Sequence, residues 1–155
     1  MRYAAAAILA FTLLFAGCTR YYVKVRLYDT RQKPVMDAGI AVEGNYIAGY
    51  GVRGGAKQPV LRKFYASRRY SYGELAFGVR NMPHSFRVSA DAPGFHKCIA
   101  RAEVTEQGEG YAQYRVMDVN SPYSPSSIII TLKGNIVFID AFLIQMEGWR
   151  GRPRR

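Results

Sequence analysis

In the segment Tyr22-Val23-Lys24-Val25-Arg26-Leu27-Tyr28, aliphatic side chains alternate with charged or aromatic ones. This period of two is typical of a strand with one buried face, and it places Val23, Val25 and Leu27 on that face. The polar run 29–34 ends in proline and predicts a turn. The alternation resumes at 38–43, so we expect a second strand there.

The same pattern continues toward the C-terminus. Turn signals rich in glycine, proline, serine or asparagine separate short apolar runs, which we predict as strands at 72–79, 85–91, 95–104, 111–119, 128–132 and 136–144. No capped amphipathic helix of normal length is readable. Short strands with turns every eight to twelve residues or so are typical of a sandwich. We therefore predict an all-β, immunoglobulin-like antiparallel sandwich over 18–146.

The first eighteen residues have the layout of an export signal. Arg2 precedes an uncharged apolar run, 3–16, which is shorter than the roughly 20 residues that span a membrane. The run ends in Leu14-Phe15-Ala16-Gly17-Cys18, which resembles the lipobox of bacterial lipoproteins, although Phe15 stands where Leu, Val or Ile is more usual. The resemblance implies that 1–17 is a cleaved signal peptide and that Cys18 carries lipid. The alternative is a signal anchor with a chance cysteine.

The resemblance to lipoproteins also implies a location. Asp after the lipidated cysteine commonly marks retention in the inner membrane, and Thr19 stands there instead. We therefore expect an outer-membrane lipoprotein that faces the periplasm, with the inner membrane and the cell surface left open.

The charge balance is strongly basic. The sequence has 22 Lys and Arg against 11 Asp and Glu, a formal net charge of +11. Such a balance usually indicates nucleic acid, but export would remove that partner. We expect instead an acidic envelope protein, an acidic polymer or a lipid headgroup. The basic tail 147–155 is predicted to be disordered.

The segment 44–71 is rich in glycine and tyrosine, and no acidic residue lies between Glu43 and Glu74. We predict a long irregular connection with one short strand at 60–65, since the glycines break regular structure. Its basic and aromatic side chains suit an adhesive surface, and the alternative is a solvated loop that patches the sandwich. The candidate binding residues are Arg53, Arg62, Lys63, Tyr65, Arg68, Arg69 and Tyr70.

Two segments resemble the transthyretin-like and carboxypeptidase-regulatory-like sandwiches. Residues 25–42 are similar to the opening hairpin of these families, and 86–95 to a strand that ends in alanine, glycine and an aromatic residue. One enzyme with this fold, hydroxyisourate hydrolase, carries a catalytic histidine where Arg26 stands here. Without that base its chemistry has no start, so the resemblance implies a fold and not this activity.

Other candidate chemistry is weak. Gly49 to Gly54 fits G-x-G-x-x-G, but no helix is readable after it to receive a phosphate. His84, His96 and Cys98 do not complete a zinc site, which needs four ligands. We expect no metal and no cofactor. Cys98 is predicted to be a buried, inert thiol, and the alternative is a disulfide between two chains.

The sequence therefore predicts a non-enzymatic, membrane-anchored lipoprotein that acts as a binding or assembly module in the envelope. Two alternatives are an accessory lipoprotein of a secretion or surface-assembly machine, and an envelope enzyme that uses His96 and Cys98.

Overall fold

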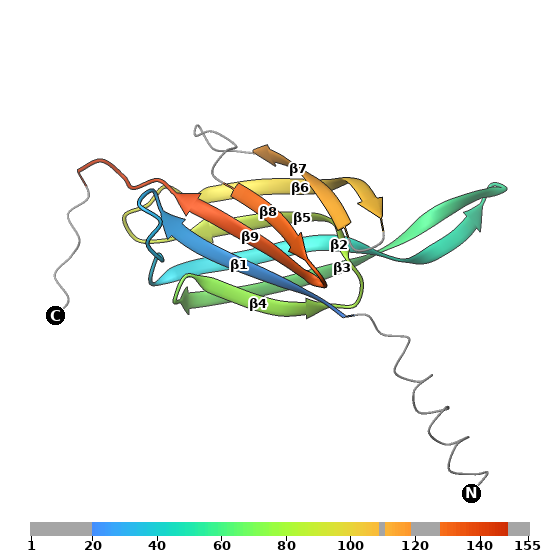
Figure 1. Cartoon of the computed structure of the whole chain (residues 1–155), viewed down its shortest axis with the longest axis horizontal. Coiled ribbons are helices and arrows are strands. Elements are labelled where there is room, and N and C mark those ends of the chain that lie inside the picture. Colours follow the sequence, from blue (N-terminus) through green and yellow to red (C-terminus); the bar gives the residue numbers. More distant parts are fainter. Residues whose placement is uncertain (1–19, 109–110, 119–127, 149–155) are drawn as a thin grey trace, which may run out of the picture.

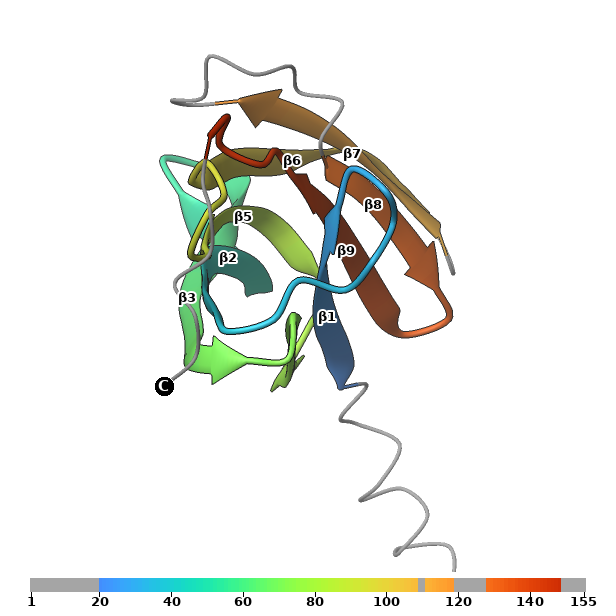
Figure 2. The same ribbon diagram turned by 90° about the vertical axis from the view of Figure 1, so that its left-hand side faces the viewer.

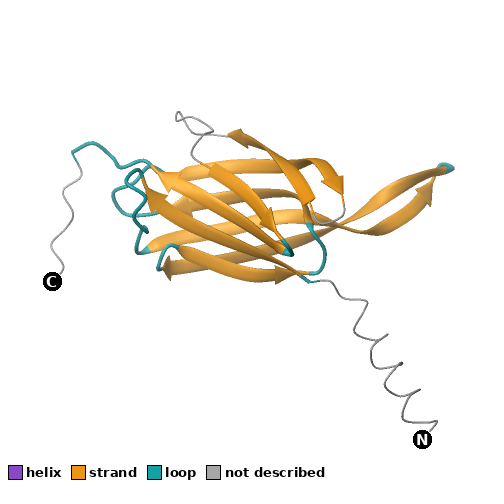
Figure 3. Cartoon of the chain, in the orientation of Figure 1, coloured by secondary structure: helices purple, strands orange, loops and turns teal. Residues whose placement is uncertain are grey.

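The computed structural model describes residues 20–108, 111–118 and 128–148, with the side chains of Tyr70, Ser71 and Asp118 excepted. This part of the chain is all-β and contains no helix (Figure 3). Its strands are β1 (Tyr21–Asp29), β2 (Ala38–Arg53), β3 (Ala56–Ser71), β4 (Glu74–Val79), β5 (Pro83–Asp91), β6 (Cys98–Gly108), β7 (Tyr111–Asp118), β8 (Ile128–Lys133) and β9 (Ile136–Leu143). Within these ranges, no helix is long and apolar enough to cross a membrane.

The strands form two sheets that face each other (Figures 1 and 2). The four-stranded sheet has the order β4-β1-β9-β8, and the five-stranded sheet has the order β3-β2-β5-β6-β7. The predicted all-β sandwich is confirmed. All pairs within the sheets are antiparallel except β1 with β9, where Val25 lies beside Ile139 in a parallel register. Local alternation cannot reveal that pairing, because it depends on which distant strands become neighbours.

The core lies between the two sheets and follows the period-two pattern. Val25, Val42 and Ile139 have no exposed surface, and Val88 is almost completely buried. The predicted buried face of the first strand is therefore correct, since Val23 and Leu27 also belong to this core. Ile40 of β2 and Phe86 and Ala90 of β5 complete the same pattern.

The long connection predicted over 44–71 is wrong, because this segment forms most of a hairpin with two strands of 16 residues each. Gly54 and Gly55 have φ of +60° and +79° and form its two-residue turn, which glycine adopts without steric cost. β2 pairs with β5 only as far as Tyr46, so the hairpin continues beyond the sheet. We call residues 47–61 the arm, which projects from one end of the sandwich (Figure 1).

Several sequence predictions concern residues outside the described ranges. They are the signal peptide 1–17, the lipidated Cys18, and the tail from Trp149 onward. These remain predictions from the sequence.

Candidate functional site

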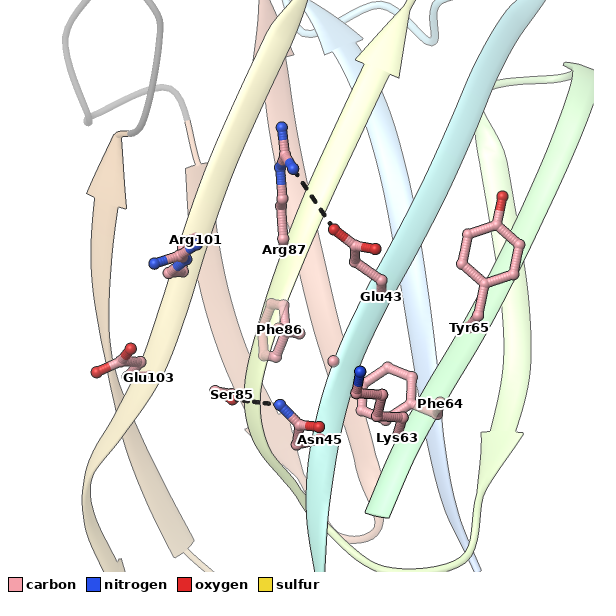
Figure 4. A pocket seen from close by; sticks show the side chains of 11 residues that line it. Glu43, Asn45, Lys63, Phe64, Tyr65, Ser85, Phe86, Arg87, Arg101 and Glu103 are labelled. Carbon is pink, nitrogen blue, oxygen red and sulfur yellow. Dashed lines mark hydrogen bonds and ion pairs between the residues drawn. The ribbon is translucent and has the colours of Figure 1, made fainter. Parts of the chain in front are cut away.

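The outer face of the five-stranded sheet carries an open depression with a volume of about 590 Å³ (Figure 4). Polar side chains from four neighbouring strands surround it, and we call them the sheet-face site. They are Glu43 and Asn45 from β2, Lys63 and Tyr65 from β3, Ser85 and Arg87 from β5, and Arg101 and Glu103 from β6.

The register of the sheet arranges these side chains in two rows, because residues directly opposite each other on antiparallel strands point to the same face. One row runs Tyr65, Glu43, Arg87, Arg101 across β3, β2, β5 and β6. The adjacent row runs Lys63, Asn45, Ser85, Glu103 over the same strands. The site is therefore built on paired strands of a sheet and not on a loop.

In the first row, Arg87 stands between Glu43 and Arg101. Its Nη1 lies 3.5 Å from Glu43 Oε1, which makes a long and half-exposed ion pair. Its Nε is buried and has no hydrogen-bond partner in the described part of the chain. On its other side stands Arg101, and like charges directly opposite each other destabilise a sheet. An anion between the two guanidinium groups would relieve the repulsion between them.

The floor of the depression is formed at Gly44, where β2 lies very close to the neighbouring strands β3 and β5. Gly44 has no Cβ, and a Cβ there would stand 2.3 Å from the Ser85 carbonyl oxygen and 2.7 Å from Phe86 Cβ. Phe64 and Phe86 pack beneath this point, against the core. In the second row, Asn45 Nδ2 donates a weak hydrogen bond, 3.4 Å long, to Ser85 Oγ.

Of the predicted binding residues whose side chains the structure describes, two lie at this site, Lys63 and Tyr65. Arg62 is opposite Tyr46, which packs against the core, and Arg68 is opposite the buried Ile40, so both are on the inner side of the edge strand β3. Both are nevertheless exposed. Arg53 lies beside the turn of the arm, at the far end of the hairpin.

The two remaining candidates lie near the C-terminal end of β3. Arg69 is exposed there, next to an irregularity in the register, and the side chain of Tyr70 is outside the described part. The predicted cluster is therefore not a single surface.

Sequence reasoning missed Glu43, Arg87, Arg101 and Glu103. The signal was present in the alternation itself, because each of these residues occupies the polar phase of its strand. Ser85 and Arg87 alternate with the buried Phe86 and Val88, for example. The phase does not reveal which strands are neighbours, so the rows could not be assembled.

The other chemical candidates are dispersed. His84 is the second residue of β5 and His96 follows the end of that strand, so more than about 20 Å of sheet separates them. Cys98 begins β6 and is half-buried, packed against the core. Among the described residues, no group of three His, Cys, Asp or Glu side chains could hold a metal ion. The G-x-G-x-x-G glycines lie in β2 and its turn.

Arg26, which stands where the hydrolase has its histidine, is engaged on the outer face of the four-stranded sheet. Its Nε and Nη2 donate hydrogen bonds to Oδ1 and Oδ2 of Asp140, and both distances are 2.6 Å. These hydrogen bonds raise the pKa of Arg26. The guanidinium group also lies 4.8 Å from the centre of the Phe138 ring. Arg26 therefore joins β1 to β9.

Comparison with known proteins adds information about the fold. Scans of protein-family models and of curated proteins find no match. The fold is similar to part of a solved pilus adhesin, SpaC from Lactobacillus rhamnosus GG in an open conformation, with 11% identity, a TM-score of 0.53 and coverage of 86% of this chain. This chain spans only 15% of that adhesin. A C-terminal fragment of the same adhesin gives 13% identity, a TM-score of 0.48 and coverage of 84% of this chain and 47% of the fragment.

At such identities the likeness shows a shared β-sandwich fold alone. The resemblance to transthyretin-like and carboxypeptidase-regulatory-like domains stays a prediction from the sequence.

Proposed function

We propose that this protein is a non-enzymatic binding module of the cell envelope, held at a membrane by lipid on Cys18. In this proposal the sheet-face site binds an acidic group, a carboxylate or phosphate, of an envelope protein or polymer. The observation that carries it is the pair Arg87 and Arg101, two cationic side chains that face each other in register and both line the depression.

The chemistry of arginine supports an anion at this place. A guanidinium group presents its N–H donors in a planar fork that matches a carboxylate or a phosphate, and charge-assisted hydrogen bonds of this kind are roughly twice as strong as neutral ones. Lys63 and Tyr65 border the same depression. A tyrosine adds contact area and can stack on a sugar ring or a peptide group. The excess of basic over acidic residues, 22 against 11 in the whole sequence, also attracts an acidic partner.

The binding test uses beads that carry polygalacturonate or polyphosphate, with amylose as the uncharged reference. We compare Lys63→Ser/Arg101→Ser with Arg62→Ser/Arg68→Ser. Each variant loses two exposed cationic side chains, so the net charge of the two proteins is the same. The first pair should weaken binding about tenfold or more, equivalent to 1.4 kcal/mol. Arg62 and Arg68 lie on the other side of β3, so their double substitution should change the affinity for the beads by less than about twofold. Equal losses would show that net charge and not the site is responsible.

The anchor is tested separately. The N-terminal peptide of the mature protein should begin at Cys18 and carry acyl chains by mass spectrometry, and Cys18→Ala should release the protein from the membrane fraction. An unmodified peptide that retains the first seventeen residues would refute the anchor. Photo-crosslinking from position 101 in intact cells would then separate a free-standing binder from an accessory lipoprotein of an assembly machine.

A further inference from the structure

The arm gathers four exposed large apolar side chains, Tyr50, Val52, Val60 and Leu61, within one hairpin. Val52 is 79% exposed and Tyr50 is 61% exposed, and Leu61 is 47% exposed. The register puts Tyr50 opposite Pro59 and Val52 opposite Lys57, so these four side chains share one face. Beyond Tyr46, β2 has lost its pairing with β5, and the arm continues as two strands alone.

A two-stranded ribbon of this kind is marginally stable by itself in water. Its apolar side chains are also not scattered singly over the surface, as exposed apolar residues usually are, but gathered on one projecting element. These properties are typical of a surface that binds a partner.

Its charge indicates what covers it. The sequence has no acidic residue from position 44 to position 73. Arg53, Lys57 and Arg62 are all exposed on the arm or at its base, and Lys57 Nζ lies 5.1 Å from the centre of the Tyr50 ring. Lys57 shares the face of Tyr50 and Val52, whereas Arg53 and Arg62 alternate onto the other face of this narrow ribbon. Apolar and aromatic side chains with basic ones beside and behind them match the boundary between acyl chains and anionic headgroups, where tyrosine is enriched.

The position of the arm supports the same partner. Tyr21, the first residue of β1, lines a groove at the base of the arm together with Ile47, Tyr50 and His84. Tyr21 is three positions after Cys18, and three steps of extended chain span at most about 11 Å. Lipid on Cys18 would therefore hold this end of the sandwich close to the bilayer, and the arm projects from the same end (Figure 1).

We propose that the arm is a second membrane contact, in which Tyr50 and Val52 enter the headgroup region of an anionic bilayer while Arg53 and Lys57 pair with lipid phosphates. This inference rests on the proposed attachment at Cys18. A lipid anchor together with a basic patch holds a protein more firmly than a single signal does. It also orients the domain, because two contacts define how the sandwich stands on the membrane.

The test places a fluorescent reporter on the arm of the full protein, purified from membranes so that lipid on Cys18 is retained. In a Trp149→Phe background, which removes the single native tryptophan, Tyr50→Trp is compared with Tyr72→Trp. Tyr72 is 81% exposed and lies in the turn between β3 and β4, at the opposite end of the sandwich from the arm (Figure 1). Each protein is reconstituted into vesicles of phosphatidylglycerol and phosphatidylcholine that carry brominated acyl chains.

Tyr50→Trp should show at least about twofold stronger quenching than Tyr72→Trp, since an interfacial element is buried about 5–10 Å into the headgroup and acyl boundary. Vesicles of phosphatidylcholine alone, or the added changes Arg53→Ser and Lys57→Ser, should reduce the quenching. Equal quenching at both positions, or none at position 50, would overturn the inference. A photo-crosslink from position 50 to a protein, without quenching, would overturn it in favour of a protein partner.

The mass of the N-terminal peptide from the same sample separates this inference from the proposed function. An acylated Cys18 without quenching at position 50 leaves the anchor standing and removes the membrane contact of the arm. Quenching at position 50 with an unmodified Cys18 would refute the lipid anchor and leave the membrane contact of the arm standing.

Discussion

Gly44 offers the sharpest test of how the sheet-face site is built. A Cβ at this position would stand 2.3 Å from the Ser85 carbonyl oxygen, 2.6 Å from Phe64 Cζ and 2.7 Å from Phe86 Cβ. The ring of Phe64 can rotate away, but the other two atoms belong to or adjoin the backbone of β5. Gly44→Ala must therefore push β2 and β5 apart at the floor of the depression.

The expected cost follows from these contacts. Overpacking a well-filled core typically costs 1–3 kcal/mol, and three contacts this short favour the upper end, about 3 kcal/mol. For a domain of this size each kcal/mol lowers Tm by roughly 3–5 °C, so we expect a decrease of roughly 10 °C. Urea unfolding followed by far-UV circular dichroism measures the same loss. Binding to polyanion beads should also decline, because the floor of the site moves.

Gly51→Ala is the matched control, since it makes the same substitution in the same strand. A Cβ at position 51 meets only Val60 Cγ2, at an ordinary contact distance of 3.5 Å. Replacing glycine by alanine without strain stabilises by about 0.4–1 kcal/mol through the unfolded state, so this variant should be at least as stable as the parent protein. The reasoning fails if Gly44→Ala loses less than about 1 kcal/mol, or if both variants behave alike.

Three further predictions concern other parts of the fold. A double-mutant cycle of Arg26→Ala and Asp140→Ala should give a coupling energy of about 1 kcal/mol in urea unfolding, since the pair is bidentate but partly exposed; a value near zero would leave β1 and β9 held by packing and backbone pairing alone. Burial raises the pKa of the Tyr114 hydroxyl above the ordinary 10.0. Above pH 10 the unfolded state therefore releases this proton while the folded state keeps it, so the free energy of unfolding is highest below pH 10 and falls as the pH rises toward the raised pKa. Tyr114→Phe should show a smaller loss of stability than the parent between pH 9 and pH 11, although it also removes the hydrogen bond to the Pro83 carbonyl; parallel pH profiles would contradict this. Gly55→Ala places a side chain at φ +79° and should cost about 1–2 kcal/mol locally, seen as faster hydrogen exchange over 47–61 while Tm changes little.

The sequence predicted the sandwich well because burial of one face has a local signature. Val23, Val25 and Leu27 could be assigned to a buried face from alternation alone, and the structure buries all three. The hairpin of β2 and β3 was missed for a different reason. Gly49, Gly51, Gly54 and Gly55 were read as breakers, although two consecutive glycines between alternating residues also indicate a two-residue turn.

The site was only partly predictable, and the reason is geometric. Basic and aromatic residues close together in the sequence suggested one patch, but adjacent residues of a strand point to opposite faces, so Arg62 and Lys63 cannot share a surface. Arg87 and Arg101 are 14 positions apart and become neighbours only through the pairing of β5 with β6. Their like charges oppose that pairing, while the apolar residues in the other phase, Val88 and Ala100, favour it. Burial of the inner face thus forces the two cations together on the outer face, and an acidic ligand that bridges them would stabilise the sheet as well as bind to it. Ligand-free protein should therefore gain Tm when polyphosphate is added, and Arg101→Ser should remove that gain while raising the Tm of the ligand-free protein.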